Sequence, residues 1–414
     1  MSRLACLVSA LLVLLAAPPA SAYGVLAHEA VIDAAWERSI VPLLRTKFHP
    51  SDEELKKARA FAYGGSLIQD LGYYPFSSRT FGDLTHYVRS GDFVVALLRD
   101  ARTLDEYAFA LGALAHYPSD VDGHPIAVNP SVALIYPKLR AKFGPHITYE
   151  QKPSAHLKTE FGFDVIQVVR GTYAPSMYHD FIGFEVAKPV LERAFLDTYG
   201  LDINSVFGDL DLAIGSFRYA VNTMIPQMTK VAWQSKRAEI EKMMPGITEE
   251  RFRFGLSRHE YEGEWGLKYD RPGLRSKFLA LVLRVIPKIG PFRALAFKLP
   301  TPEAEALFVT SFQTSVDRYR ALVADAARSR LTQDDRNFDT GKPVHAGDYE
   351  RVDAAYEALL ERLEEDDFRQ TSPALRADLL RFLSTIPEPT ESRDLKKWRK
   401  AQAQLEQLKA LTGN

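Results

Sequence analysis

Cysteine is almost absent from this 414-residue sequence, which contains only Cys6. A chain processed beyond that position has no thiol, which excludes disulfides, thiolate metal sites and a cysteine nucleophile. Any metal must then be bound by histidine, carboxylate and backbone atoms. No uninterrupted apolar stretch of membrane-spanning length follows the N-terminal segment, so we expect a soluble or peripheral protein. The formal net charge of −1 argues against a dedicated nucleic-acid binder with a broad basic surface.

The first 22 residues have the pattern of an export signal. Arg3 supplies the positive start, Leu4 to Ala17 form a short apolar run, and Ala20-Ser21-Ala22 is a small-residue cleavage site. We predict cleavage before Tyr23, which would place the mature protein in the periplasm or outside the cell. An uncleaved N-terminal anchor is the alternative.

Alternating strand patterns are scarce, and helical periodicity dominates the chain. Ser51 with Glu54 predicts a capping box at the start of a helix that runs to about Tyr63 and ends at Gly64-Gly65. Further helices are predicted over Ala27 to Trp36, Phe93 to Arg99, Leu104 to His116, from Thr301-Pro302 and Ser372-Pro373, and over Asp348 to Glu364 and Glu391 to Leu411. The sequence therefore predicts an all-α protein.

About 390 mature residues favour two units. We place a soft boundary near residue 245, which separates an N-terminal domain over residues 23–245, the one that would be catalytic on the evidence of the motifs described below, from a helical C-terminal region over 246–414. In that region Arg271 to Lys298 carry seven basic residues and no acidic one, interleaved with Leu, Val, Ile and Phe. This segment fits a peripheral contact with anionic lipid, or a helical hairpin packed on the catalytic domain.

The ten histidines are concentrated toward the N-terminal part of the chain. His116 and Asp120 form an i, i+4 pair, His124 follows four residues later, and His156 with Glu160 forms a second such pair. Residues at i and i+4 share one face of a helix, so each pair can bind a single ion. His116 and His124 would lie about 12 Å apart along an ideal helix axis, which is too far for one zinc ion. If all three residues bind metal, Asp120 bridges and the site holds more than one ion; Asp122 is a competing carboxylate.

This ordered set resembles the ligand series of the zinc-dependent phospholipase C and S1/P1 nuclease superfamily, an all-α fold that holds three zinc ions. The resemblance covers about Tyr23 to Glu160 and does not reach the C-terminal third. The residues that carry it are Tyr23-Gly-Val-Leu-Ala-His28, Asp70, His86, His116-x3-Asp120, His124 and His156-x3-Glu160.

The resemblance implies which residues share each ion. The free amine and carbonyl of Tyr23 would bind one zinc with His28 and Asp120. A second zinc would take its ligands from Asp70, His86, His116 and the bridging Asp120. The third zinc would be bound by His124, His156 and Glu160.

The implied activity is hydrolysis of a phospholipid to diacylglycerol and a phosphorylated headgroup. Asp70 would orient or deprotonate the attacking water, and Tyr73, Tyr74 and Phe76 are candidates for a headgroup pocket or for packing. Glu160 at the last ligand position favours the phospholipases over the nucleases. A single-strand nuclease on the same three-zinc scaffold, and a non-catalytic, zinc-stabilised lipid-binding protein, are the alternatives.

Overall fold

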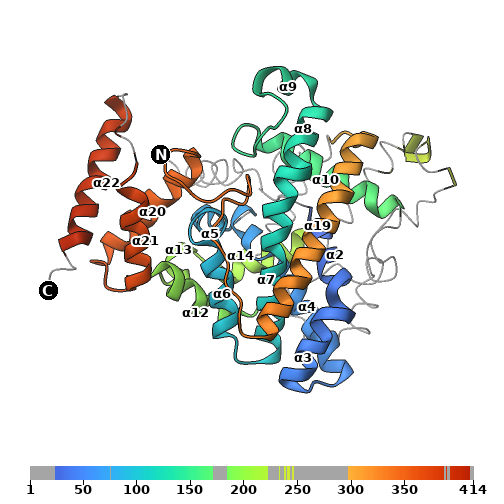
Figure 1. The fold of residues 1–414 in the computed structure, drawn as a ribbon, viewed down its shortest axis with the longest axis horizontal. Helices are drawn as coiled ribbons and strands as arrows, with labels where there is room; N and C mark the ends of the chain where they lie inside the picture. Colours follow the sequence, from blue (N-terminus) through green and yellow to red (C-terminus); the bar gives the residue numbers. More distant parts are fainter. Residues whose placement is uncertain are drawn as a thin grey trace, which may run out of the picture.

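The computed structural model describes residues 24–74, 76–170, 184–221, 297–386 and 392–410, with isolated positions between 233 and 246 and at 388. These residues form helices joined by loops, and no strand occurs among them apart from one isolated bridge between Arg336 and Pro343. The fold of the described chain is therefore all-α, as the sequence predicts (Figure 1).

The N-terminal helices follow one another through short connections. They are α2 (Val25–Ala35), η1 (Trp36–Ile40), α3 (Val41–Phe48), α4 (Asp52–Leu67), η2 (Gln69–Tyr73), α5 (Arg79–Tyr87), α6 (Ser90–Asp100), α7 (Leu104–Gly123), η3 (His124–Val128), α8 (Asn129–Ile135), α9 (Pro137–Phe143) and α10 (Pro153–Arg170). The later ones are α12 (Lys188–Tyr199), α13 (Ile203–Val206), α14 (Leu210–Tyr219), α19 (Pro302–Ala327), α20 (Glu350–Glu365), α21 (Pro373–Leu383) and α22 (Ser392–Ala410).

Three predicted helix starts are confirmed by their caps. The Ser51 hydroxyl accepts a hydrogen bond from the Glu54 N–H while the Glu54 carboxylate accepts one from the Ser51 N–H, which completes the capping box. Thr301 caps α19 and Ser372 caps α21, each with proline at the first helical position.

The predicted end of α4 at Gly64-Gly65 is wrong, because the helix continues to Leu67. These glycines allow close approach rather than ending the helix. A Cβ at Gly65 would lie 1.8 Å from the Phe109 carbonyl oxygen of α7, and a Cβ at Gly112 of α7 would lie 2.0 Å from the Ala62 carbonyl oxygen of α4. Backbone therefore packs on backbone between α4 and α7, the two helices that lead to Asp70 and His116.

Gly112→Ala is expected to lower the free energy of unfolding by about 1–3 kcal/mol or more, because overpacking against a backbone carbonyl forces the two helices apart. The gain in helix propensity, about 0.5–1 kcal/mol, is smaller. Gly208→Ala is the matched control, since an added Cβ there meets nothing within 4 Å, and should change stability by less than about 0.5 kcal/mol. Chemical denaturation measures both, and equal stabilities would refute the close-packing argument.

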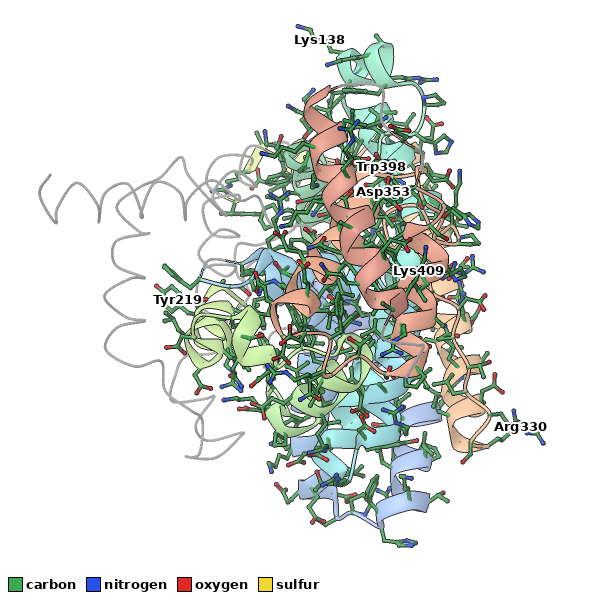
Figure 2. The ribbon with its side chains drawn as sticks, turned by 90° about the vertical axis from the view of Figure 1, so that its left-hand side faces the viewer. Lys138, Tyr219, Arg330, Asp353, Trp398 and Lys409 are labelled. Atoms are coloured by element: carbon green, nitrogen blue, oxygen red, sulfur yellow. The ribbon has the colours of Figure 1, made fainter. Side chains whose placement is uncertain are left out.

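Helix α19 packs against the N-terminal helices. The Tyr319 hydroxyl donates to the Leu111 carbonyl at 2.9 Å and the Ser315 hydroxyl donates to the Pro118 carbonyl at 3.1 Å, so α19 lies alongside α7 (Figure 1). Helices α20, α21 and α22 form a separate layer at one end, where Trp398 and Lys409 mark α22 in Figure 2. The C-terminal region thus contributes directly to the packing around α7.

Several predicted features lie outside the described residues. They are the signal peptide, Tyr23, most of the region around the proposed boundary, and Arg271 to Lys298 apart from its last two residues. Of those two, Phe297 is buried against Phe161, and the Lys298 ammonium donates to the Ile135 carbonyl at 3.3 Å. Among the described helices, none combines the length and the apolar character that crossing a bilayer requires.

Candidate metal centre

Eight of the predicted ligands come together in the interior, from six helical elements. Each of them is at most 2 % exposed. His28 lies on α2, Asp70 on η2, His86 on α5, His116 and Asp120 on α7, His124 on η3, and His156 and Glu160 on α10. Titratable side chains buried at this density need charge compensation from one another or from a bound cation.

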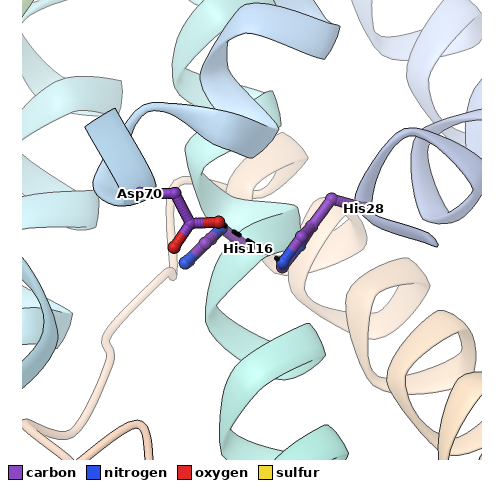
Figure 3. A group of neighbouring side chains, drawn as sticks. All are labelled: His28, Asp70 and His116. Carbon is purple, nitrogen blue, oxygen red and sulfur yellow. Dashed lines mark ion pairs between the residues drawn. The ribbon is translucent and has the colours of Figure 1, made fainter. Parts of the chain in front are cut away.

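His28, Asp70 and His116 form the first group. Figure 3 shows these side chains converging from α2, η2 and α7, with an ion-pair contact of 3.8 Å between His28 Nε2 and Asp70 Oδ2. The two imidazole rings stack, with centroids 4.4 Å apart and planes 10° from parallel. One ligand atom from each residue lies within 4.8 Å of the others, and the same holds for His86, His116 and Asp120. The two groups share His116, so these residues can face two neighbouring metal ions.

Asp120 lies at the centre of the cluster and faces three imidazoles. Its Oδ2 atom is 3.2 Å from His116 Nε2 and 3.5 Å from His86 Nε2, while Oδ1 is 3.6 Å from His28 Nε2. The two oxygens of one carboxylate therefore point toward different histidines. This is the geometry that a bridging ligand requires.

His124, His156 and Glu160 form a separate group that can hold another ion. His156 Nδ1 is 3.8 Å from Glu160 Oε1, one turn later on α10, and the rings of His124 and His156 have centroids 5.7 Å apart. The i, i+4 spacing on α10 brings its two side chains together, and the turn from α7 into η3 adds His124. His116 and His124 belong to different groups, as the helix geometry predicts.

Outer hydrogen bonds fix which nitrogen each histidine directs into the cluster. Nδ1 of His116 donates to the Ser66 carbonyl at 2.8 Å, and Nδ1 of His86 donates to the Gly82 carbonyl at 2.8 Å. The tautomer assigned from these bonds leaves the lone pair of each neutral ring on Nε2, directed at Asp120. A lone pair facing a carboxylate oxygen repels it unless a proton or a metal ion lies between them.

The donor atoms fit a metal ion for a second reason. Neither oxygen of Asp120 or Glu160 accepts a hydrogen bond from any described residue, and Nε2 of His86 and His116 and Nδ1 of His124 and His156 likewise have no hydrogen-bond partner there. Leaving so many buried polar atoms unsatisfied is costly, and a shared cation would satisfy them together. A mixed set of imidazole nitrogens and carboxylate oxygens suits zinc.

Residues 27–209 match the family model described as zinc dependent phospholipase C. This part of the chain is therefore similar to that family. All eight buried ligand candidates lie within the matched residues. No curated protein and no solved structure matches the chain.

Burial and the neighbouring carboxylates set the pKa values of the clustered side chains. Burial lowers the pKa values of His124 and His156 to about 3, which keeps both imidazoles in the neutral form that binds metal. Burial also lowers the pKa of His116, but Asp120 and Asp70 outweigh it and raise that pKa to about 9. The pKa of Glu160 is raised well above its usual value by burial and by Asp70 and Asp120 nearby. The carboxylates are thus held in a site that favours a cation.

The other predicted site residues, Asp122, Tyr73 and Tyr74, have surroundings different from those of the clustered ligands. Asp122, the competing carboxylate, pairs with Arg318 at 3.0 Å and has no place in the cluster. Tyr73 is buried with its ring edge-on to His86 at 5.1 Å, while Tyr74 packs against Phe217 at 4.0 Å.

Phe76 is half-buried and has a positive φ of 65°. The Arg351 guanidinium lies over the Tyr73 ring, with its Cζ atom 5.8 Å from the ring centroid. A cation of the protein itself therefore already lies near one of the three aromatic residues. Outside the cluster, His49, His146 and His345 are exposed.

One part of the site was not predicted, and it comes from beyond the residues that match the family. Phe338 packs against the rings of His86 and His116, and Asp339 Oδ1 lies 3.5 Å from His124 Nε2. No motif spacing links these residues to the N-terminal ligands. Only the packing of the C-terminal region onto α5 and α7 brings them there.

Proposed function

We propose that this chain is an exported, zinc-dependent phospholipase C-like phosphodiesterase, which hydrolyses a phospholipid to diacylglycerol and a phosphorylated headgroup. The observation that carries the proposal is Asp120, a fully buried carboxylate faced by three imidazoles, beside the separate group of His124, His156 and Glu160. The family match supports the general class of reaction. Substrate and export are inferred from Glu160 and from the signal-like N-terminus.

We assign the ligand residues to three ions. Asp70, His86, His116 and Asp120 would hold the first ion. His28, Asp120 and the Tyr23 amine would hold the second ion. The third ion would be held by His124, His156 and Glu160. Zinc bound there supplies Lewis acidity, which acidifies water and neutralises the charge of the phosphodiester.

Asp70 would act on the attacking water. Its Oδ1 atom is 3.5 Å from His86 Nε2 and its Oδ2 atom is 3.8 Å from His28 Nε2, so the carboxylate lies between two parts of the cluster. Water attacks phosphorus, its proton passes to the Asp70 carboxylate, and the bond from phosphorus to the glycerol oxygen breaks. The diacylglycerol oxygen then takes up that proton from Asp70, which restores the carboxylate. No serine or cysteine nucleophile is needed.

Removing the metal should abolish the activity and restoring zinc should recover it. We expect the processed protein to contain close to three zinc ions and to release phosphocholine from phosphatidylcholine micelles. The same preparation is assayed after treatment with a chelator and again after zinc is added back.

The outcomes separate the rival functions. Release of acid-soluble nucleotides from single-stranded DNA, without phosphocholine release, would identify a nuclease. Bound zinc without turnover of any phosphodiester would indicate a structural or lipid-binding role. A protein with one zinc ion or none would contradict the whole proposal.

A further inference from the structure

The segment Gln333 to Tyr349, which we call the C-terminal strap, is fastened across the family domain. The Ser90 hydroxyl donates to the Arg336 carbonyl at 2.7 Å, and the Tyr117 hydroxyl donates to the Asp334 carbonyl at 2.7 Å. Neither bond depends on a charged group at the surface. The strap is therefore attached to α6 and α7 by side-chain hydrogen bonds, and residues 337–339 within it are buried.

The strap also covers the zinc ligands. The Phe338 N–H donates to the His86 carbonyl at 3.2 Å, and its ring lies 5.3 Å from that of His86 and 5.9 Å from that of His116. Phe338 is fully buried. The residue that follows it is therefore placed beside the cluster with little freedom.

Asp339 follows Phe338 and faces a ligand of the second group. Its Oδ1 atom lies 3.5 Å from His124 Nε2, and both residues are at most 2 % exposed. Asp339 does not belong to the group of His124, His156 and Glu160, whose ligand atoms lie within 4.8 Å of one another. It stands behind the imidazole of His124 rather than among the ligands.

The two histidines of this group are arranged alike. His156 uses Nε2 to donate to the Ile147 carbonyl at 2.5 Å, which leaves Nδ1 for the cluster. His124 Nδ1 likewise has no hydrogen-bond partner among the described residues, and Nε2 is the atom that faces Asp339. We propose, on the basis of the zinc centre proposed above, that Asp339 is a positioning residue that accepts the Nε2–H of His124 and so directs Nδ1 at the metal.

The Asp339 carboxylate is itself oriented by two tyrosines. The hydroxyls of Tyr87 and Tyr349 donate to its Oδ2 atom at 2.7 and 2.6 Å. These donors leave Oδ1 to serve His124. Carboxylate groups behind a ligating histidine fix its tautomer and raise its basicity.

Asp339→Asn is a sharp test because the tyrosines dictate how the amide will lie. Its oxygen will accept the two tyrosine hydroxyls, so its NH₂ group will face His124 Nε2. A donor at that position forces the proton of the ring onto Nδ1 and removes the ligand lone pair. We expect one of the three zinc equivalents to bind about 10–100-fold more weakly, with the other two unchanged.

Equilibrium dialysis against zinc buffered over a range of free concentrations, with metal counting by mass spectrometry, measures this loss. Asp348→Asn is the matched control, since it makes the same change at an exposed position of the strap and should bind zinc as the unchanged protein does. Tyr87→Phe removes one of the two donors to Asp339 and should weaken the same equivalent by a smaller factor.

A double variant separates positioning from simple support of the fold. In a His124→Ala background, which already lacks that equivalent, Asp339→Asn should cause no further loss of zinc. Unchanged zinc affinity in Asp339→Asn would overturn the assignment. So would weakening of all equivalents together with a large fall in the melting temperature of the metal-free protein. An unaltered protein that binds no zinc would refute the metal centre itself, and the role of Asp339 with it.

Discussion

Replacing Asp120 with asparagine is expected to remove two of the three zinc equivalents and to lower phosphodiesterase activity by about three orders of magnitude. The carboxylate faces His28, His86 and His116 within 3.6 Å, and neither oxygen has a hydrogen bond to a described residue. An amide carries no charge and presents a donor where one oxygen bridges. Metal ions supply several kcal/mol of charge stabilisation in the transition state, and about 1.4 kcal/mol corresponds to a factor of ten.

Asp122→Asn provides the control on the same helix. Its carboxylate pairs with Arg318, away from the cluster, so zinc content and activity should stay within about threefold of the unchanged protein. The metal-free forms of both variants should melt within a few degrees of the parent, which shows that the loss is not unfolding. Retention of three zinc ions by Asp120→Asn would disprove the bridging role.

A protein that keeps one extra residue before Tyr23 is expected to lose at least about tenfold in activity and one zinc equivalent. An amide nitrogen in that position cannot act as a metal ligand, whereas the free amine can. Tyr23 lies outside the described residues, and the residues directly after it lead into α2. The Asp164 carboxylate of α10 accepts the N–H groups of Leu26 and Ala27 at 3.2 and 3.1 Å and anchors the first turn of α2.

That anchor joins the start of the mature chain to the cluster. Glu160 lies one turn before Asp164 on α10, and His28 lies in the first turn of α2. The first turn of α2, which carries His28, is therefore tied to the helix that carries Glu160. Tyr23→Phe in the correctly processed chain is the control and should retain activity, because the proposed ligand atoms are in the main chain. Full activity of the extended form, with its N-terminus verified by mass spectrometry, would rule out the amine as a ligand.

The helical fold was predictable because its signals are local. Ser51 with Glu54, Thr301 with Pro302 and Ser372 with Pro373 start helices through contacts within one turn. The end of α4 was not predictable in the same way. Glycine is a helix breaker when judged locally. Here Gly65 lets the α7 backbone pack directly on α4, and Gly64 lets the Glu185 backbone do the same.

The ligand candidates were predictable for a related reason. The i, i+4 pairs His116 with Asp120 and His156 with Glu160 need only a helix to bring their members together. In the fold, the two side chains of each pair lie close to each other. The family resemblance added His28, Asp70 and His86. Their convergence on Asp120 depends on long-range packing that spacing alone does not encode.

The sequence by itself therefore determined the all-α class, the helix starts and the residues able to bind zinc, because periodicity, capping and i, i+4 geometry act within a few residues. Only the tertiary structure decided that Asp120 rather than Asp122 faces the histidines, and that Phe338 and Asp339 reach the cluster from the far end of the chain. Those outcomes depend on which helix faces meet. That choice is made by the packing of α7 against α4 and α19 and by the strap that crosses them.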